Sequence, residues 1–500
     1  MTQSSNIDEA EETMQEALDR LAIWADRWKM TVSTEKTECA LFTTDPHQAK
    51  RQPKLTFKDE PVKFNATPTL LGVVLDRTLS FKHHINAIRK RMDKRLNVLA
   101  ALRGTTWGCR KSHLRSLYTT YVRPVAEYGM AAWMPPTAAS SKARIEVANN
   151  RGARIITGCT RTTPTDLLLD EADLMPLEER GKVLSCIALE KALRQPEDNP
   201  RSETAKANQR RRLKTQRSWR EEGRPLCDAL HLNEYPREAL LPVPSFPPWN
   251  SIPNVTFRPN LDEEIRRIDD PAHKKRAANA TISALPIADF DIYTDGAVGE
   301  GCRRGGAGCT ITNRAGGNHT ITNPAGYLCS SFKAEQIALC GALEWLQSQS
   351  NLCQGAEVRI CTDSRSLIQS LQSGPAKRPD ECSRRIWELL ALLFQPNTAH
   401  LTLQWVPGHS DVEGNEAADA LAKRGMNAPQ RGTPIDFDSA KAAIKRHVWH
   451  RWKAGITNAF HKNKAQAQRR GDESQLGVEE QRILSQLRGG GHCTILQSSI

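Results

Sequence analysis

The chain has 500 residues, which is too long for one compact core and predicts roughly two to four domains. Hydrophobic residues make up 39% of it and charged residues 25%, close to the average of globular proteins, and no apolar run approaches the roughly 18 residues that cross a bilayer, so membrane and fibrous classes are excluded. Lys and Arg number 70 against 57 Asp and Glu, and the net charge of +13 favours a polyanionic partner such as nucleic acid.

The first 80 residues predict a helix followed by a small sheet. Within residues 9–30, apolar side chains recur at steps of three or four, which is typical of an amphipathic helix with one buried face. Residues 31–42 and 70–75 are short segments of β-branched and apolar character, and each predicts a strand. We assign residues 1–80 to one unit.

Residues 81–193 predict an all-helical region. Apolar residues recur at helical spacing in four segments, which are residues 81–102, 111–133, 140–156 and 165–193. Between Phe81 and Arg115 there are ten Lys or Arg and one acid, Asp93. Such a run is often a solvated helix face, but its one-sided charge and the neighbouring Trp107 favour a surface that follows phosphates.

Three segments make up the rest of the chain. Residues 194–285 contain polar clusters and many prolines, with nine basic residues between Arg201 and Arg224, and predict a linker. Alternating strand and helix patterns predict a compact domain over residues 286–427. Residues 428–500 form a basic tail, whose residues 441–470 predict either a helix with a Trp stripe or a flexible arm that binds nucleic acid.

Cysteine usage and the N-terminus bear on the compartment. The thirteen cysteines include no C-x-x-C pair and are odd in number, so neither a zinc ribbon nor a disulfide framework is supported. Residues 1–30 include acids where a secretory signal would be basic and then apolar. We expect an intracellular protein, in the nucleus or the cytoplasm, with no membrane partner. The sequence leaves its oligomeric state open.

Carboxylates stand at corresponding places in the compact domain. Asp295 and Asp363 each come at the end of a predicted strand, and Glu335 lies on the first turn of a predicted helix among small and apolar neighbours. His409 follows a later strand, and Asp419 lies ten residues beyond it on a helix. Each could be an ordinary turn or surface residue, but a βαβ arrangement would bring all five to one point.

The composition of this set indicates which ion it would bind. Four carboxylates without Cys or a dense His cluster suit a hard cation, so Mg²⁺ or Mn²⁺ is favoured over zinc. Two such ions at a site can offset the charge of a scissile phosphate and hold the attacking and leaving oxygens. The set therefore predicts metal-dependent hydrolysis of a phosphodiester, and no small-molecule cofactor is expected.

The chain resembles type 1 ribonuclease H in four motifs, which occur in the family's order: Tyr-Thr-Asp295-Gly, Ala-Glu335, Thr-Asp363-Ser and Gly-His409-Ser-Asp-Val-Glu-Gly-Asn415-Glu-Ala-Ala-Asp419. The resemblance implies an α/β fold, a five-stranded mixed sheet with flanking helices. It also implies an enzyme that cleaves the RNA strand of an RNA–DNA hybrid.

The resemblance also implies a role for each matching residue. Two Mg²⁺ ions would be bound by four carboxylates, those of Asp295, Glu335, Asp363 and Asp419. His409 would move protons or assist product release. Contacts to the hybrid, read by its 2′-hydroxyls and minor-groove shape, would come from Gly296, Ser364 and Asn415. The basic protrusion of some family members is not evident at residues 373–381, so flanking basic segments would have to supply hybrid affinity.

The N-terminal region resembles the end of a reverse transcriptase of non-LTR (LINE-like) retrotransposons. The matching stretches lie within residues 12–158 and include Glu35-Lys36-Thr-Glu-Cys, Leu71-Gly-Val and His84-Ile. The resemblance implies that residues 1–80 end the palm and residues 81–193 form a thumb-like region. Because the Y-x-D-D-type strand is not found, we expect no polymerisation.

The last residues also resemble that family. Gln-Leu-Arg-Gly-Gly-Gly-His492-Cys493 is similar to the start of the segment that follows the nuclease, where a zinc knuckle often occurs. Since no further Cys or His follows, we expect no zinc site, and we expect the chain to be part of a longer polyprotein. The alternative to an active nuclease is a catalytically silent remnant that binds nucleic acid.

Overall fold

The computed structural model describes residues 1–500 except 1, 3, 5, 49, 105, 208–216, 241–245, 248–249, 267, 350–354, 376–379, 396–397, 461–475 and 489–500. The chain divides into two compact units. Unit 1 is Met1–Ser185, Arg210–Glu222 and Val448–Ile500, and unit 2 is Cys186–Gln209 and Gly223–His447. Within the described part of the chain, no helix combines the length and apolar character of a membrane-spanning segment.

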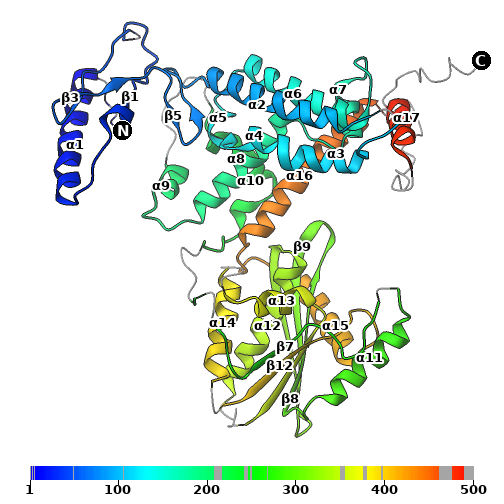
Figure 1. Cartoon of the computed structure of the whole chain (residues 1–500). Coiled ribbons are helices and arrows are strands. Elements are labelled where there is room, and N and C mark those ends of the chain that lie inside the picture. Colours follow the sequence, from blue (N-terminus) through cyan, green and yellow to red (C-terminus); the bar gives the residue numbers. More distant parts are fainter. Residues whose placement is uncertain are drawn as a thin grey trace, which may run out of the picture. The chain divides into compact units, whose positions relative to one another are not determined.

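Unit 1 begins with a long helix and three very small sheets (Figure 1). Helix α1 (Ile7–Arg27) begins after Asn6, whose side chain accepts a hydrogen bond from the Asp8 amide. The strand pairs are β1 (Glu38–Cys39) with β4 (Lys63–Phe64), β2 (Thr56–Phe57) with β3 (Glu60–Pro61), and β5 (Thr69–Leu70) with β6 (Val73–Val74). The strand expected over residues 31–42 is therefore reduced to the turn η1 (Thr34–Lys36) and β1.

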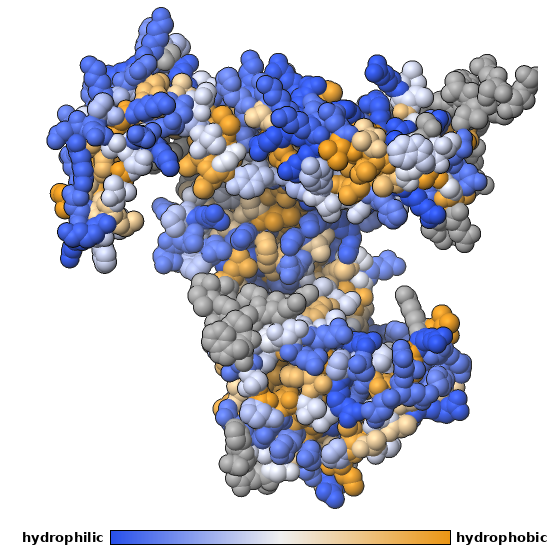
Figure 2. Space-filling view, in the orientation of Figure 1, coloured by the Kyte–Doolittle hydropathy of each residue, from blue (hydrophilic) through white to orange (hydrophobic). Residues whose placement is uncertain are grey.

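The apolar face of α1 is exposed over its second half, whereas Met14 and Leu18 are half-buried, which contradicts the expectation that the face would be buried. Ala25 is the one buried residue of this helix, all of which is described. Leu21 is 40% exposed, Trp24 47% and Trp28 64%. Apolar side chains accordingly reach the surface along α1 in Figure 2.

The rest of unit 1 is helical, as expected. Its elements are α2 (Lys82–Ala101), α3 (Lys111–Leu117), η2 (Tyr118–Val122), α4 (Pro124–Glu127), α5 (Met130–Trp133), α6 (Ala139–Thr157), α7 (Thr165–Glu171), α17 (Val478–Arg488) and the first half of α8 (Leu177–Leu193), which continues into unit 2. Two predicted helices are interrupted. Gly129, with a φ of 61°, separates α4 from α5, and Asp173, with a φ of 53°, lies between α7 and α8. Tyr118 and Trp133 are fully buried in the core that these helices share.

Unit 2 is built on one six-stranded sheet. Its strands are β7 (Val255–Arg258), β8 (Phe290–Val298), β9 (Arg303–Asn313), β10 (Asn318–Leu328), β11 (Glu357–Thr362) and β12 (His400–Trp405). They run in the order β10-β9-β8-β11-β12-β7. The pairs β10–β9 and β9–β8 are antiparallel, whereas β8, β11, β12 and β7 are parallel. The mixed α/β class is confirmed, with one strand more than the five expected.

Helices cover both faces of this sheet (Figure 1). They are α11 (Pro271–Ala284), α12 (Ser331–Ser348), α13 (Arg365–Gln372), α14 (Glu381–Leu393) and α15 (Glu413–Asn427). Alternate residues of a strand face opposite sides. On β9, Cys309 belongs to the core that includes α12, α13 and α14, whereas Gly306 and Gly308 lie against α15. Helix α11 packs on the α15 side, with Ala277 and Val412 in one apolar cluster.

The segment expected to be a linker, residues 194–285, contains regular structure. It holds α9 (Pro200–Lys206), α10 (Trp219–Ala229), η3 (Leu232–Glu234), β7 and α11. Strand β7 pairs with β12 over four residues, and Val255 is 9% exposed within the sheet core. Pairing with β12 and burial of Val255 explain why this strand forms although prolines lie on both sides of it.

The basic C-terminal segment is helical where it is described. Helix α16 (Phe437–Phe460) covers the first part of residues 441–470, and the rings of Trp449 and Trp452 lie 5.1 Å apart. Trp452 packs against the core of unit 1. The helical alternative therefore fits this part, whereas residues 461–470, His492 and Cys493 lie outside the described residues.

Candidate active site

Asp295 and Asp363 lie side by side at one edge of the sheet of unit 2. Asp295 is on β8, and Asp363 directly follows β11. The two strands are parallel neighbours, and Thr294 is the partner of Thr362. The residue after each partner is therefore an aspartate, so the strand register itself brings the two carboxylates together.

Glu335 reaches the same place from the first turn of α12. The helix begins after Ser330, whose hydroxyl accepts a hydrogen bond from the Lys333 amide at 3.1 Å. Helix and strand approach so closely that a Cβ on Gly296 would lie 2.4 Å from the Glu335 nitrogen. Only glycine fits at this position, directly beside Asp295, because α12 packs against the strand backbone there.

These three acids form a compact cluster. Carboxylate oxygens of Asp295, Glu335 and Asp363 all lie within 4.8 Å of one another, and Asp295 and Glu335 are each 6% exposed. Burial and the negative charges of Asp363 and Asp419 raise the pKa of Asp295 to about 7. Burial is also the main cause that raises the pKa of Glu335 and that of Asp363. Carboxylates this close repel each other unless a proton or a cation lies between them.

A second group adjoins the first. Ligand atoms of His409, Glu416 and Asp419 lie within 4.8 Å of one another. The negative charge of Asp419 raises the pKa of both Asp295 and Asp363, so the two groups share one electrostatic environment. His409 is exposed in the loop before α15, with a φ of 50°. The structure thus brings together all five residues that the sequence singled out.

Glu416 and Lys423 were not identified from the sequence. Glu416 precedes Asp419 by three residues on α15, and that spacing places both on one helix face. Lys423 follows Asp419 by four residues and donates a hydrogen bond to its carboxylate. The helical spacing was the available signal for both, but acids in a first turn and i,i+4 ion pairs are also common on ordinary helices.

The residues expected to touch a substrate differ in accessibility. Ser364 directly precedes α13 and is partly exposed beside Asp363. Gly296 packs beneath α12, as described above. Asn415 lies on the first turn of α15 and is 2% exposed, and its Oδ1 has no hydrogen-bond partner among the described residues.

Neighbouring groups hold the Asp363 loop in place. The indole nitrogen of Trp405 donates to the Asp363 carbonyl at 3.0 Å, and the guanidinium of Arg365 lies 5.4 Å from the Trp405 ring. A Cβ on Gly408 would lie 2.4 Å from Asp363 Oδ2, so the loop that carries His409 passes directly against the carboxylate.

The donor set suits a hard divalent cation. It offers carboxylate oxygens from three separate elements, β8, α12 and the end of β11, with further donors on α15 and its preceding loop. No cysteine takes part in either group among the described residues. Such oxygen-rich sites prefer ions like Mg²⁺, Mn²⁺ or Ca²⁺ to zinc.

Known proteins resemble this chain in two ways. The RNase H family model matches residues 288–427. The chain is 30% identical over 150 residues to a ribonuclease H of Yersinia pestis (strain Pestoides F), covering 28% of this chain and 90% of that protein. The matched region is therefore nearly the whole of the bacterial protein.

Two Drosophila melanogaster proteins match over longer or comparable stretches. The chain is 32% identical over 183 residues to a probable RNA-directed DNA polymerase from transposon BS, covering 35% of this chain and 19% of that protein. It is 28% identical over 151 residues to a probable RNA-directed DNA polymerase from transposon X-element, covering 30% and 16%. The chain thus spans less than a fifth of the length of either transposon protein.

Proposed function

The chain belongs to the ribonuclease H family through residues 288–427, and from that membership we propose that it hydrolyses the RNA strand of RNA–DNA hybrids as part of a retrotransposon-derived protein. One observation carries the proposal. Asp295, Glu335 and Asp363, which match the family's acidic motifs, converge within 4.8 Å from three different elements.

The four motif acids would hold two Mg²⁺ ions, for which Mn²⁺ could substitute. Asp295, Glu335 and Asp363 supply one cluster of oxygens, and Asp419 supplies another beside it. The raised pKa values of the first three indicate a site that lacks a compensating positive charge, which fits a cation. When bound, such ions would activate water and neutralise the charge of the scissile phosphate.

The chain's own residues would orient the substrate and move protons. His409 is exposed beside Asp363, where its imidazole would take up or release a proton near the leaving group. Ser364 would contact the hybrid at the rim of the site. Asn415 would accept a hydrogen bond from a 2′-hydroxyl once binding makes its side chain accessible. Gly296 would contribute by allowing α12 to approach β8.

A cleavage assay tests the proposal. Purified protein with Mg²⁺ is expected to cut the labelled RNA strand of a hybrid, to leave a DNA duplex intact and to stop in EDTA. Glu335→Gln is expected to lose cleavage, whereas Glu344→Gln, on the exposed face of the same helix, is expected to retain it. Absence of RNA cleavage by the unmodified protein, or unchanged cleavage after Asp363→Asn, would refute the proposal.

A second function, binding of nucleic acid without catalysis, is favoured by the surface of α2. Lys90, Arg91 and Lys94 are all exposed on this helix of unit 1. Measurements of binding and cleavage at different metal and salt concentrations distinguish the two functions. A binding protein would retain hybrid in EDTA with an affinity that falls steeply as salt rises, and would release no product with Mg²⁺.

A further inference from the structure

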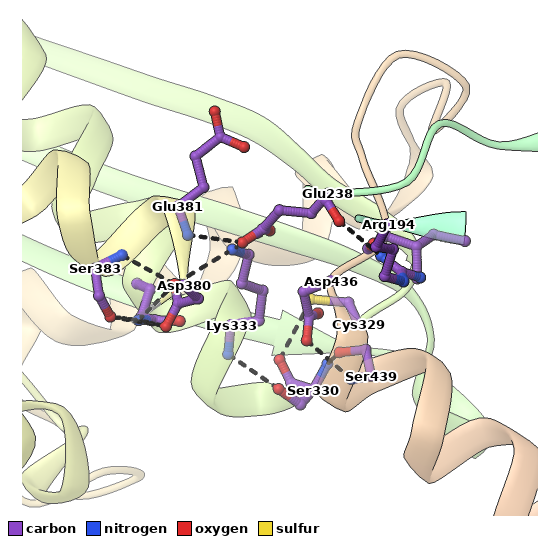
Figure 3. Close-up of polar contacts among 12 residues, drawn as sticks. Arg194, Glu238, Cys329, Ser330, Lys333, Asp380, Glu381, Ser383, Asp436 and Ser439 are labelled. Carbon is purple, nitrogen blue, oxygen red and sulfur yellow. Dashed lines mark hydrogen bonds and ion pairs between the residues drawn. The ribbon is translucent and has the colours of Figure 1, made fainter. Parts of the chain in front are cut away.

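A buried ion pair lies next to the proposed catalytic glutamate. Lys333 is on the first turn of α12, two residues before Glu335. Its ammonium lies 2.7 Å from Glu238 Oε2 and 3.7 Å from Asp380 Oδ1. The side chains of Lys333 and Glu238 are only 8% and 7% exposed. Figure 3 shows the lysine between the two acids.

Glu238 belongs to a segment outside the family match. Its amide donates to the Ile435 carbonyl at 3.0 Å, and its carbonyl accepts from Arg194 at 3.1 Å. The Ile435 amide donates in turn to Pro236 at 2.9 Å. Backbone hydrogen bonds therefore join the segment around Glu238, which precedes residues 288–427, to the segment around Ile435, which follows them.

The same flanking chain also holds the start of α12 directly. Ser439 Oγ accepts a hydrogen bond from the Ser330 amide at 3.0 Å, and Ser330 is the residue that caps α12. The second oxygen of Glu238 accepts from the Glu381 amide at 2.9 Å, at the beginning of α14. We call Arg194, Glu238, Ile435 and Ser439 the clasp, of which Figure 3 labels Arg194, Glu238 and Ser439.

Because Lys333 is buried, its position depends on the negative charge of Glu238. A buried ammonium is costly unless an opposite charge compensates it, and removal of one partner leaves the other uncompensated. Asp380 is a poor replacement because its oxygens already accept from Ser383 and Gln336. Without Glu238, the lysine would turn toward water, and the helical turn that carries Lys333 and Glu335 would move with it.

We propose that Glu238 is a positioning residue for Glu335, and that the clasp makes the nuclease dependent on chain outside residues 288–427. This inference rests on the proposed function. Glu238 does not touch the acidic cluster, and acts through Lys333 on the orientation of the first turn of α12. Residues that orient metal ligands in this way commonly change metal affinity or activity by about 10- to 100-fold.

The test compares Glu238→Gln with the unmodified full chain in two measurements. The first is cleavage of a hybrid, where kcat is expected to fall about tenfold with KM for the hybrid unchanged. The second is calorimetric titration with Mn²⁺, where Kd is expected to rise about tenfold. Because Glu238 is remote from the substrate, an effect on KM alone would overturn the proposal.

A matched control separates positioning from general stability. Leu346→Ala removes a fully buried side chain near the other end of α12 and destabilises the domain. It is expected to leave kcat and the Mn²⁺ affinity unchanged at a temperature where the protein is folded. If Glu238→Gln behaves like Leu346→Ala, with a lower Tm and unchanged kcat and Kd, the role of Glu238 is structural only and the proposal is wrong.

A second variant guards against misfolding. Glu238→Gln with Lys333→Met removes both charges of the closer pair, and Asp380 keeps its hydrogen bonds from Ser383. The double variant is expected to recover stability but not the full Mn²⁺ affinity, because the pair that fixes the turn is absent. Full recovery of affinity would contradict the proposal. Lack of cleavage and of Mn²⁺ binding in the unmodified protein would instead refute the proposed function itself.

Discussion

Asp363 lies beside Asp295 because the residues just before them, Thr362 and Thr294, are partners in the parallel pairing of β11 with β8. Their proximity is thus a property of the backbone, and the repulsion between the carboxylates is built into the fold. A site of this kind stores electrostatic free energy that a bound cation releases.

In EDTA, unit 2 is expected to lose stability as pH rises from about 4 to about 7. The folded pKa of Asp295 is raised from 3.8 to about 7, so in this window the folded state binds more protons than the unfolded state. The stabilisation is complete below the unfolded pKa and is lost as pH rises through the folded pKa. Hydrogen exchange of β8 and β11 measures the effect.

Asp295→Asn and added metal are the controls for this pH dependence. The variant lacks the titrating group, so its exchange is expected to change less over the same range. At pH 8, Mg²⁺ at a hundred times its Kd is expected to stabilise the unmodified protein by about 2.7 kcal/mol. An equal pH slope in both proteins would show that Asp295 does not govern the effect.

Gly308→Ala is expected to reduce both stability and cleavage. A Cβ there would lie 2.2 Å from the Ala418 carbonyl oxygen and 2.4 Å from the Ala422 nitrogen, so α15 must shift and Asp419 with it. Overpacking of this kind costs about 1–3 kcal/mol. Thermal unfolding and the hybrid assay measure the two effects. Gly432→Ala, which meets nothing within 4 Å, is the matched control and should leave both unchanged.

Val255→Asp is expected to detach β7 from the sheet. Val255 is buried against the sheet core, and an unpaired charge there costs about 2 kcal/mol or more. Faster hydrogen exchange in β12, the partner of β7, is the readout. Thr256→Asp places the same charge on the exposed side of the strand and should have little effect. Equal exchange in the two variants would mean that β7 contributes nothing to the domain.

Trp24→Glu is expected to reduce self-association of the protein. Trp24 belongs to the open apolar face of α1, and exposed apolar surface of this kind favours aggregation. Light scattering against protein concentration measures the change. Thr13→Glu adds the same charge on an exposed position of α1 without removing apolar surface. If both variants lower scattering equally, charge and not the apolar face is responsible.

Much of unit 2 was predictable because its signals are local. Alternating side chains mark β8 and β11, and an acid late in each segment marks the site before any contact is known. Asp295 was expected at the end of its strand, but β8 continues to Val298 because β9 pairs with it that far. Apolar residues at helical spacing predict α12, and Glu335 is the acid among small and apolar neighbours on its first turn. The order of the motifs then predicts the family, which the match over residues 288–427 and the similarity to ribonuclease H confirm.

Other features depend on distant partners that a local pattern does not contain. Strand β7 has four residues and pairs with a strand more than a hundred residues later, so its prolines and polar neighbours suggested a linker. Burial of Lys333 depends on Glu238, ninety-five residues earlier. The apolar periodicity of α1 predicted a buried face, but Trp24 remains 47% exposed in the described chain.

The position of β7 in the chain sets the order in which the domain can be completed during synthesis. Val255 is synthesised 146 residues before Leu401, its partner on β12. Strand β7 therefore stays unpaired until the other five strands have been synthesised. Parallel pairing over such a separation is slow to form. The Glu238 amide donates its hydrogen bond to Ile435, which follows the end of α15. This contact can therefore form only after α15 has been synthesised.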